Sequence, residues 1–312
     1  MKQFLAKSLW FLLPVLLFFT AMEIYIRNSE NSFITKAKYF QKNKEQVEVL
    51  VLGSSHNQNG VNPKFFRSKT TNLSYGSQDI QIDSALFFSN VKQMKNLKKV
   101  VFELDYHRLD IENKPDFYRF PWYYMYYGIE VQPVKFVHKV SLYSSNVDFF
   151  NTIILDQFSS NYKPQVINEF GFVEKNYTDD FVGFFYMENK IEATAKERLK
   201  SRHKEFSAKN FNRNASRIQS MIAYCKNNNI ELYFFSSPLY KTYIENKIPM
   251  KDQKVKNYIQ KLITNEKINY YNFENTSRFE LYDFSNDDHL NAKGAEKYSK
   301  LIDSIIHQWN AF

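Results

Sequence analysis

Cysteine, glycine and proline are scarce in this chain of 312 residues, which contains 1 Cys, 7 Gly and 8 Pro. The single cysteine, Cys225, excludes a disulfide within the chain and a cluster of thiolate metal ligands. Hydrophobic residues make up 44% and aromatic residues 18%, which argues against low complexity and disorder. The sequence therefore predicts a packed body, long enough for one large α/β domain or two small ones.

Clustered positive charge is also missing. The formal net charge is +9, but the Lys and Arg residues are scattered, and the chain has no compact basic helix or aromatic-basic RNA motif. No spacing of His, Asp and Glu resembles a zinc or calcium site, and there is no glycine-rich phosphate loop. We therefore expect no nucleic-acid partner, no metal and no cofactor.

A long apolar run lies at the N-terminus. No residue in Ser8–Met22 is charged, and the run approaches the roughly 17–25 residues that a membrane-spanning helix needs. Lys2 and Lys7 precede it, and Phe19–Ala21 matches the cleavage pattern of a signal peptide poorly. A buried core helix is the alternative, but the run lacks its polar stripe. We predict an uncleaved single-pass anchor over residues 1–28 in the cytoplasmic membrane, with a cytoplasmic N-terminus and an extracytoplasmic body.

The rest of the chain alternates between strand and helix patterns. Residues 29–45 are polar and charged and predict a tether or a short amphipathic lead-in to a body over 46–312. Short apolar runs predict strands at 47–52, 72–74, 100–104, 230–235 and 268–273, and helical spacing predicts helices at 80–95, 212–228, 253–265 and 292–308. This alternation predicts a three-layer α/β/α sandwich with a parallel sheet.

The alternation stops in an insertion over about residues 106–205. Its segment Phe117–Tyr127 is dense with aromatic side chains. One interpretation is a lid or a surface that stacks on sugar rings. The other is an accessory core that fixes the insertion to the sheet, which we favour because large aromatic side chains mostly serve packing.

The first chemical motif is Gly53-Ser54-Ser55-His56, directly after the first predicted strand. Ligands of open α/β sheets bind at the carboxyl ends of the strands, so this turn is where a nucleophile would be displayed. The glycine permits a sharp turn. The alternative is a serine that only caps a helix. His56 cannot easily reach its neighbour's hydroxyl, and we interpret it as a substrate contact or a loop packing residue.

The second motif runs from Asn286 to Ala295, just before the last predicted helix, and contains Asp287, Asp288 and His289. A serine nucleophile needs a base within hydrogen-bond reach, and that base needs a third group to hold its tautomer. The alternative is a polar helix start whose carboxylates complement the helix dipole.

Together the two motifs resemble the SGNH, or GDSL-type, hydrolase superfamily. In that family the nucleophile follows the first strand in a Gly-Asp-Ser turn, and an Asp-x-x-His pair precedes the last helix. A glycine after the second strand and an asparagine after the third help to form its oxyanion hole. The resemblance implies that Ser55 is the nucleophile and His289 the base, with Ser54 in place of the aspartate and Gly76 as the second-block glycine.

The sequence departs from this family at two places. The third block, Glu103–His107, has no asparagine, so the N–H groups of Ser55 and Gly76 would serve as oxyanion donors, or His107 would contribute. Asn286 stands three residues before His289, where the family has its acid. Asp288 or Asp287 would orient the imidazole instead, or Asn286 would replace the acid, and we favour Asp288. Asn286 is also a candidate oxyanion or substrate contact.

Such departures resemble the envelope-associated branch of the superfamily, whose membrane-anchored members assist O-acetylation of alginate or D-alanylation of teichoic acid. The resemblance implies a serine esterase or O-acyltransferase acting on an ester-modified cell-envelope glycan, with a multi-spanning acyltransferase as a partner. The missing asparagine and the amide at Asn286 leave open an alternative, a non-catalytic binding or assembly partner of a membrane acyltransferase with the same fold.

Overall fold

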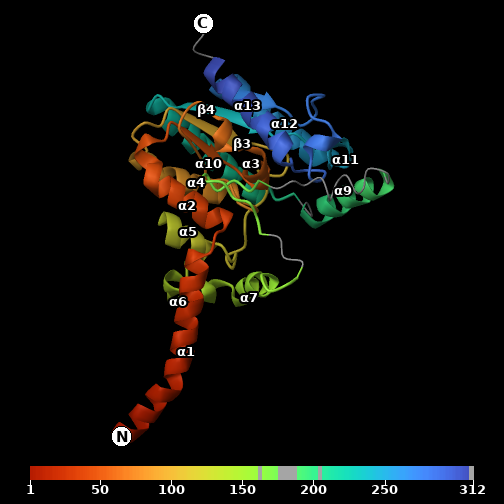
Figure 1. Cartoon of the computed structure of the whole chain (residues 1–312). Coiled ribbons are helices and arrows are strands. Elements are labelled where there is room, and N and C mark those ends of the chain that lie inside the picture. Colours follow the sequence, from red (N-terminus) through yellow and green to blue (C-terminus); the bar gives the residue numbers. More distant parts are fainter. Residues whose placement is uncertain (161–163, 175–187, 203–205, 309–312) are drawn as a thin grey trace.

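A single five-stranded sheet forms the centre of the protein. The structure, a computed structural model, describes residues 1–160, 164–174, 188–202 and 206–308 (Figure 1). The strands are β1 Val49–Leu52, β2 Thr70–Asn72, β3 Lys99–Glu103, β4 Glu231–Ser236 and β5 Asn269–Asn272. All four pairings are parallel and the strand order is β2-β1-β3-β4-β5, the doubly wound order of flavodoxin-like folds. The predicted α/β fold is confirmed.

Helices cover both faces of this sheet (Figure 1). The described α-helices are α1 Lys2–Asn28, α2 Ser32–Asn43, α3 Ser55–Gly60, α4 Ile80–Asn90, α5 Phe120–Tyr127, α6 Phe136–Val140, α7 Val147–Asp156, α9 Glu188–Arg202, α10 Ala208–Asn227, α11 Lys241–Glu245, α12 Pro249–Lys261 and α13 Ala292–Gln308. Leu50 and Leu52 pack into the core formed with α2, α4, α10 and α12, whereas Val49 and Val51 pack against α13. Alternate residues of a strand point to opposite faces, so a strand covered on both sides reads as a continuous apolar run.

The second strand lies two residues earlier than predicted, at Thr70–Asn72 rather than 72–74. The side chain of Asn72 explains why the strand ends there. Its Nδ2 donates to the carbonyl oxygens of Asn57 (2.8 Å) and Val61 (2.7 Å), and its Oδ1 accepts from the N–H of Ser74 (2.9 Å). These bonds turn the chain out of the sheet.

Helix α1 projects from the body (Figure 1). Its stretch Lys7–Asn28 is long and apolar enough to cross a membrane, as also holds for many signal sequences. Most of its large hydrophobic side chains are exposed, including Trp10 at 75% and Phe11 at 77%, whereas Ile26 near its end is buried. The membrane anchor over residues 1–28 and its topology stay predictions.

Helix α2 occupies most of residues 29–45. It begins at an Asn31 cap, whose Oδ1 accepts from the N–H of Ile34 (2.9 Å). Phe33, Ile34 and Phe40 are buried in the main core, with exposed fractions of 1%, 2% and 0%. Of the two interpretations of this segment, the structure shows the amphipathic helix.

The same helix buries a lysine. Lys36 donates from Nζ to the carbonyl oxygen of Ser74 at 2.8 Å, and burial lowers its pKa to about 7. Between about pH 7 and the ordinary value of 10.5, the unfolded chain therefore binds the proton and the native state does not. Native stability consequently rises with pH across that window. Below about pH 7 the buried amine is charged, and the full cost of desolvating it lowers the stability of the native state.

We therefore expect Lys36→Met to raise the free energy of unfolding by a few kcal/mol below about pH 7, on the order of the ammonium's desolvation penalty. The gain should shrink steadily towards pH 10.5. Urea unfolding at several pH values measures it. Lys38→Met on the same helix is the control, because Lys38 is exposed. A gain that is independent of pH would show that the Lys36 amine is not desolvated.

The aromatic segment of the insertion forms α5 and packs inward. Phe33 of α2 makes edge-on contacts with Trp122, Tyr123 and Tyr127, at ring-centroid distances of 5.5, 5.2 and 5.6 Å. These three α5 side chains are buried. This favours the accessory core over a sugar-stacking surface for α5, while 161–163, 175–187 and 203–205 of the insertion lie outside the described residues.

Candidate active site

The site residues follow the carboxyl ends of adjacent strands. β1 and β3 pair in register with Leu52 opposite Phe102, so the turn after β1 and the segment after β3 begin at the same edge of the sheet. Gly53 has φ +153, and a Cβ there would lie only 2.7 Å from the Cβ of Glu103. The sequence therefore needs glycine at this position for both backbone geometry and space.

Glu103, the last residue of β3, holds the start of α3. Its Oε1 accepts from the hydroxyl of Ser54 (2.5 Å), and its Oε2 accepts from the N–H groups of Ser54 (2.7 Å) and Asn57 (3.1 Å). Burial raises the pKa of Glu103, but the charges of Arg108 and His56 and the bonds from Ser54 outweigh it and keep this pKa below its usual value. Glu103 is thus an ionised cap of a helix start.

The two adjacent serines have different surroundings. Ser54 is 4% exposed and its hydroxyl is bonded to Glu103. Ser55 begins α3 and is partly exposed, and its hydroxyl and N–H make no hydrogen bond to any residue that the structure describes. Ser55 is therefore the serine of this turn that a ligand can reach.

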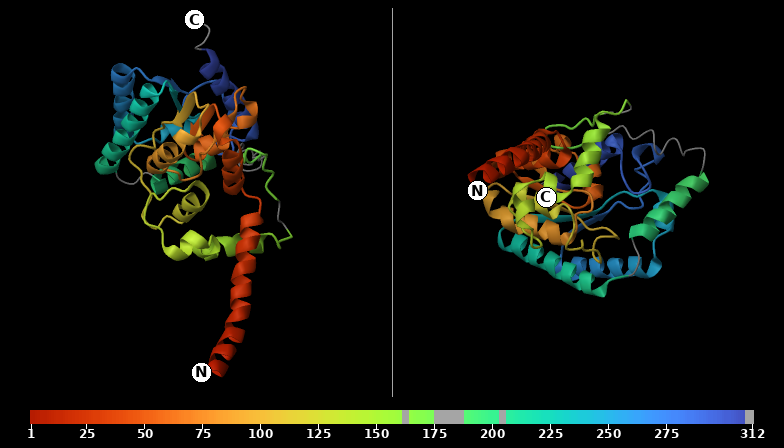
Figure 2. Two further views of the ribbon diagram at one scale, coloured as in Figure 1. Left: turned by 90° about the vertical axis from the view of Figure 1, so that its left-hand side faces the viewer. Right: turned by 90° about the horizontal axis from the view of Figure 1, so that it is seen from below.

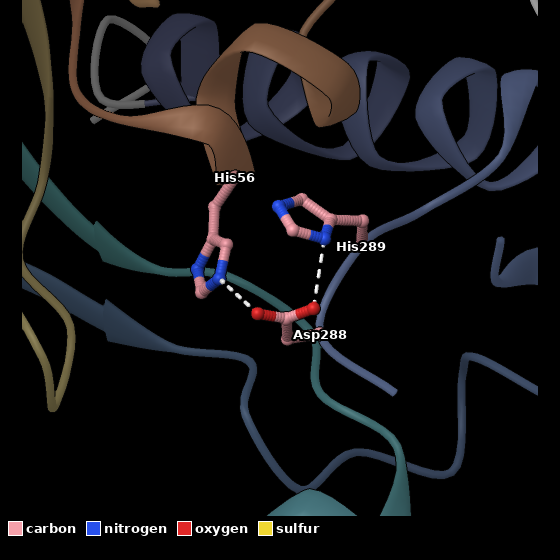
Figure 3. A group of neighbouring side chains, drawn as sticks. All are labelled: His56, Asp288 and His289. Atoms are coloured by element: carbon pink, nitrogen blue, oxygen red, sulfur yellow. Dashed lines mark ion pairs between the residues drawn. The ribbon is translucent and has the colours of Figure 1, made fainter. Parts of the chain in front are cut away.

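The imidazole of His289 is fixed through one nitrogen (Figure 3). Nδ1 lies 2.8 Å from Oδ1 of Asp288 and 3.0 Å from Oδ1 of Asn286. The same Asn286 oxygen accepts from the N–H of Asp288 at 3.1 Å, which fixes the orientation of the amide. Both oxygens are acceptors, so Nδ1 carries a hydrogen and Nε2 keeps its lone pair in the neutral ring. Asn286 and Asp288 thus both reach the nitrogen that needs orienting.

The structure brings His289 next to α3 without bonding it to Ser55. The rings of His289 and His56 lie 5.3 Å apart, and in Figure 3 the Nε2 edge of His289 is turned away from Asp288 towards the first turn of α3. The distance between a nucleophile and its base is often long in unliganded enzymes and shortens with substrate bound.

His56 is a buried link between two carboxylates. Its Nδ1 lies 2.6 Å from Oδ2 of Asp105, and its Nε2 lies 3.8 Å from Oδ2 of Asp288. Burial lowers the pKa of His56, but hydrogen bonding to Asp105 and Asp288 and the charges of Asp105 and Glu103 outweigh this and raise it to about 10. His56 is therefore an imidazolium at neutral pH. With an exposed fraction of 3%, it favours the packing interpretation over direct substrate contact.

Arg198 of α9 also contacts the acids before His289. Its Nε lies 2.7 Å from Oδ1 of Asp287, and its Nη1 lies 3.1 Å from Oδ1 of Asp288. Arg198 also lines a surface hollow with Thr194, Glu197 and Lys200. Sequence reasoning missed this arginine because no local pattern marks a partner 90 residues away.

The two remaining predicted residues flank this cluster. His107 places Nε2 3.4 Å from the hydroxyl oxygen of Ser54, and its ring lies 4.4 Å from that of His56. A Cβ on Gly76 would lie 3.2 Å from Oε1 of Gln58. Gln58 is on α3, one turn after Ser55. The structure thus gathers Gly76 and His107 around α3, although neither contacts the Ser55 hydroxyl through a hydrogen bond.

Some of these residues could also hold a metal ion. His56 belongs to two groups, one with Asp288 and His289 and one with Asp105 and His107, whose ligand atoms lie within 4.8 Å of one another. Imidazole and carboxylate are ligands that zinc accepts. A metal would have to displace the proton of His56, and the expectation of a metal-free site stays a prediction.

Comparisons with known proteins add little to this geometry. No family model matches the chain, and no curated protein sequence matches it. Among solved structures, it is similar to a Bacteroides fragilis protein to which an acylhydrolase activity is ascribed, with 12% identity and a TM-score of 0.41. That alignment covers 90% of this chain and 99% of the other. A likeness of this size carries no argument about chemistry, which therefore depends on the residues of the site.

Proposed function

We propose that the protein is a membrane-anchored serine esterase or O-acyltransferase of the SGNH type, with Ser55 as nucleophile and His289 as base. One observation carries the proposal. The reachable serine of the turn after β1 directly precedes His56, whose ring lies 5.3 Å from an imidazole whose Nδ1 is held by Asp288 and Asn286. A serine hydroxyl, a neutral imidazole and an orienting oxygen are the parts that acyl transfer needs.

The chemistry proceeds in two steps. Nε2 of His289 takes the proton of the Ser55 hydroxyl while Oγ bonds to the carbonyl carbon of an ester. The tetrahedral intermediate collapses, the ester C–O bond breaks, and His289 returns the proton to the departing alcohol. Water or a sugar hydroxyl then attacks the acyl-Ser55 ester while His289 takes its proton. The bond between the acyl carbon and Oγ breaks, Oγ receives that proton, and a carboxylic acid or a new ester is released. The N–H groups of Ser55 and Gly76 are the proposed oxyanion donors, with His107 beside them.

Asp288 serves as the orienting group in this proposal. It contacts Nδ1 of His289 and lies between two positive groups, Arg198 and His56. A carboxylate held on both sides keeps the imidazole in one orientation and stabilises the imidazolium that forms. Asp105 acts one step further away, through His56.

The proposed substrate is an ester-modified glycan of the cell envelope. The apolar stretch Lys7–Asn28 supports it, because an enzyme held at a membrane meets polymers assembled or modified there. Attack by water or by a glycan hydroxyl uses the same residues, so the acceptor decides between esterase and transferase.

Labelling of the detergent-solubilised full-length protein with a fluorophosphonate probe tests the proposal. We expect wild type to be labelled and Ser55→Ala and His289→Ala to be unlabelled, because the probe needs an activated serine. Ser54→Ala is the matched control at the neighbouring position, and we expect it to keep the label. It removes the hydrogen bond from the Ser54 hydroxyl to the charged Glu103, so we expect the free energy of unfolding to fall by about 1.5–3 kcal/mol. Exposed Ser220→Ala controls for handling.

Two outcomes would contradict the proposal. A folded wild type that stays unlabelled would favour a non-catalytic binding protein. Ester hydrolysis that disappears with a chelator and returns only with zinc would assign the histidine cluster to a metal site instead.

A further inference from the structure

A segment next to α1 forms what we call the interfacial shelf, residues 136–158. It consists of α6, the short turn Tyr143–Ser145 and α7. In Figure 1 and in the left view of Figure 2, α7 runs across the direction of α1 and lies below the body. The shelf belongs to the insertion between β3 and β4, and the site chemistry described above does not use it.

Glu23 of α1 fixes this shelf in place. Its Oε1 accepts from the N–H of Leu142 at 2.9 Å, and its Oε2 accepts from the N–H of Tyr143 at 3.0 Å and the hydroxyl of Ser141 at 2.9 Å. Arg27, one turn later, lies 2.5 Å from Glu23. The only acidic residue within the apolar stretch is thus paired and hydrogen-bonded, as a carboxylate near a membrane must be.

Further contacts tie the shelf to the same end of α1. Nη2 of Arg27 donates to the carbonyl oxygen of Val140 at 3.0 Å, and the rings of Phe19 and Tyr143 lie 5.8 Å apart. The stretch of 22 residues is about 33 Å long at 1.5 Å per residue, close to the roughly 30 Å of a hydrocarbon core. All of these contacts lie in the second half of the stretch, and those of Glu23 and Arg27 lie near its end, which places the shelf at one boundary of that core.

Most of the exposed side chains of the shelf are large and apolar, although Asp148, Thr152 and Asp156 are exposed as well. Leu142, Tyr143 and Phe150 are buried on its inner side, with exposed fractions of 1%, 4% and 4%. The large exposed side chains of the shelf are Phe136 (80%), Val137 (50%), Val140 (55%), Val147 (39%), Ile153 (37%), Leu155 (68%) and Phe158 (83%). Exposed apolar surface on this scale marks a binding surface.

We propose that the interfacial shelf is a second membrane contact, lying in the headgroup boundary of the same bilayer that α1 enters. The shelf is bonded to α1, whose own large apolar side chains are exposed, which is why lipid is the occupant we infer. Segments of this kind bury their apolar face about 5–10 Å deep. The inference rests on the membrane location proposed for α1, and it is independent of the chemistry at Ser55.

Single cysteines in the full-length protein test the inference. Cys225→Ala first removes the only native cysteine. Phe136, Leu155 and Phe158 are then changed to cysteine one at a time and labelled with an environment-sensitive fluorophore. The proteins are reconstituted in vesicles of phosphatidylcholine and phosphatidylglycerol. Met250→Cys is the matched control, because Met250 is 64% exposed at the start of α12, away from α1 in Figure 1.

We expect the three shelf labels to emit at shorter wavelength than the Met250 label. They should be quenched by a lipid that carries a doxyl group near its headgroup and protected from aqueous iodide. Iodide quenching equal to that at Met250, with no quenching by the lipid, would overturn the inference and favour a protein partner on this surface. Fluorophosphonate labelling of the same variants reports separately on Ser55, so the two proposals can fail independently.

Discussion

Ser55→Ala and His289→Ala are each expected to lower kcat for ester hydrolysis by about 10,000-fold or more, and the double variant is expected to lose no more than either single one. The reason is that a nucleophile and its base act as one unit, so removing either removes the whole reaction path. Steady-state kinetics on an activated ester, with the single and double variants purified side by side, provide the measurement.

Multiplied losses in the double variant would instead show that the two residues act independently.

Two further variants identify the orienting group within the same experiment. Asp288→Asn is expected to cost much more activity than Asn286→Ala, because an amide at position 288 can offer its N–H to the imidazole and stabilise the wrong tautomer. A larger loss for Asn286→Ala would show that Asn286, at 3.0 Å from Nδ1, is the group that orients the imidazole.

Gly294→Ala is expected to lower the free energy of unfolding by about 3 kcal/mol or more, through overpacking against rigid backbone. A Cβ at this position, in the first turn of α13, would lie 2.1 Å from the carbonyl oxygen of Asp283. That oxygen also accepts the N–H of Asn291 at 2.9 Å, so it cannot move without breaking the loop that carries His289. Urea unfolding of the full-length protein measures the loss.

Gly60→Ala is the matched control for this substitution. Gly60 also faces α13, but the nearest atom to its added Cβ would be Cδ1 of Tyr298 at 3.4 Å, which is an ordinary contact. We expect its unfolding midpoint to stay close to that of wild type. Equal midpoints for the two variants would show that the loop before α13 gives way easily.

Local features of the sequence predicted most of the fold. The run 47–52 predicts a strand because a strand that is covered on both faces is apolar throughout. The last helix, α13, has its predicted bounds, Ala292–Gln308. Gly53 was recognisable because a tight turn follows a buried strand. The second strand was misplaced because Asn72, which ends it, acts through side-chain bonds to Asn57 and Val61.

The site was predictable only where its partners are close in sequence. Asp288 and Asn286 lie within three residues of His289, and the structure places both at its Nδ1. Glu103 as the cap of α3 and Arg198 as the partner of the acids could not be predicted, because both contacts depend on tertiary packing across the sheet and the insertion. The role of Ser55 stays a prediction.

The short link between α1 and α2 limits where such a protein can work. Only residues 29–31 separate the two helices, at most about 10 Å of extended chain, and α2 is itself buried in the core. With α1 in a membrane, as proposed above, a body attached in this way would have a fixed height above the bilayer and a small working radius, unlike an enzyme on a long flexible linker. In that proposal the substrate has to approach the enzyme, which would favour long, mobile polymers able to bring distant ester groups to one stationary point.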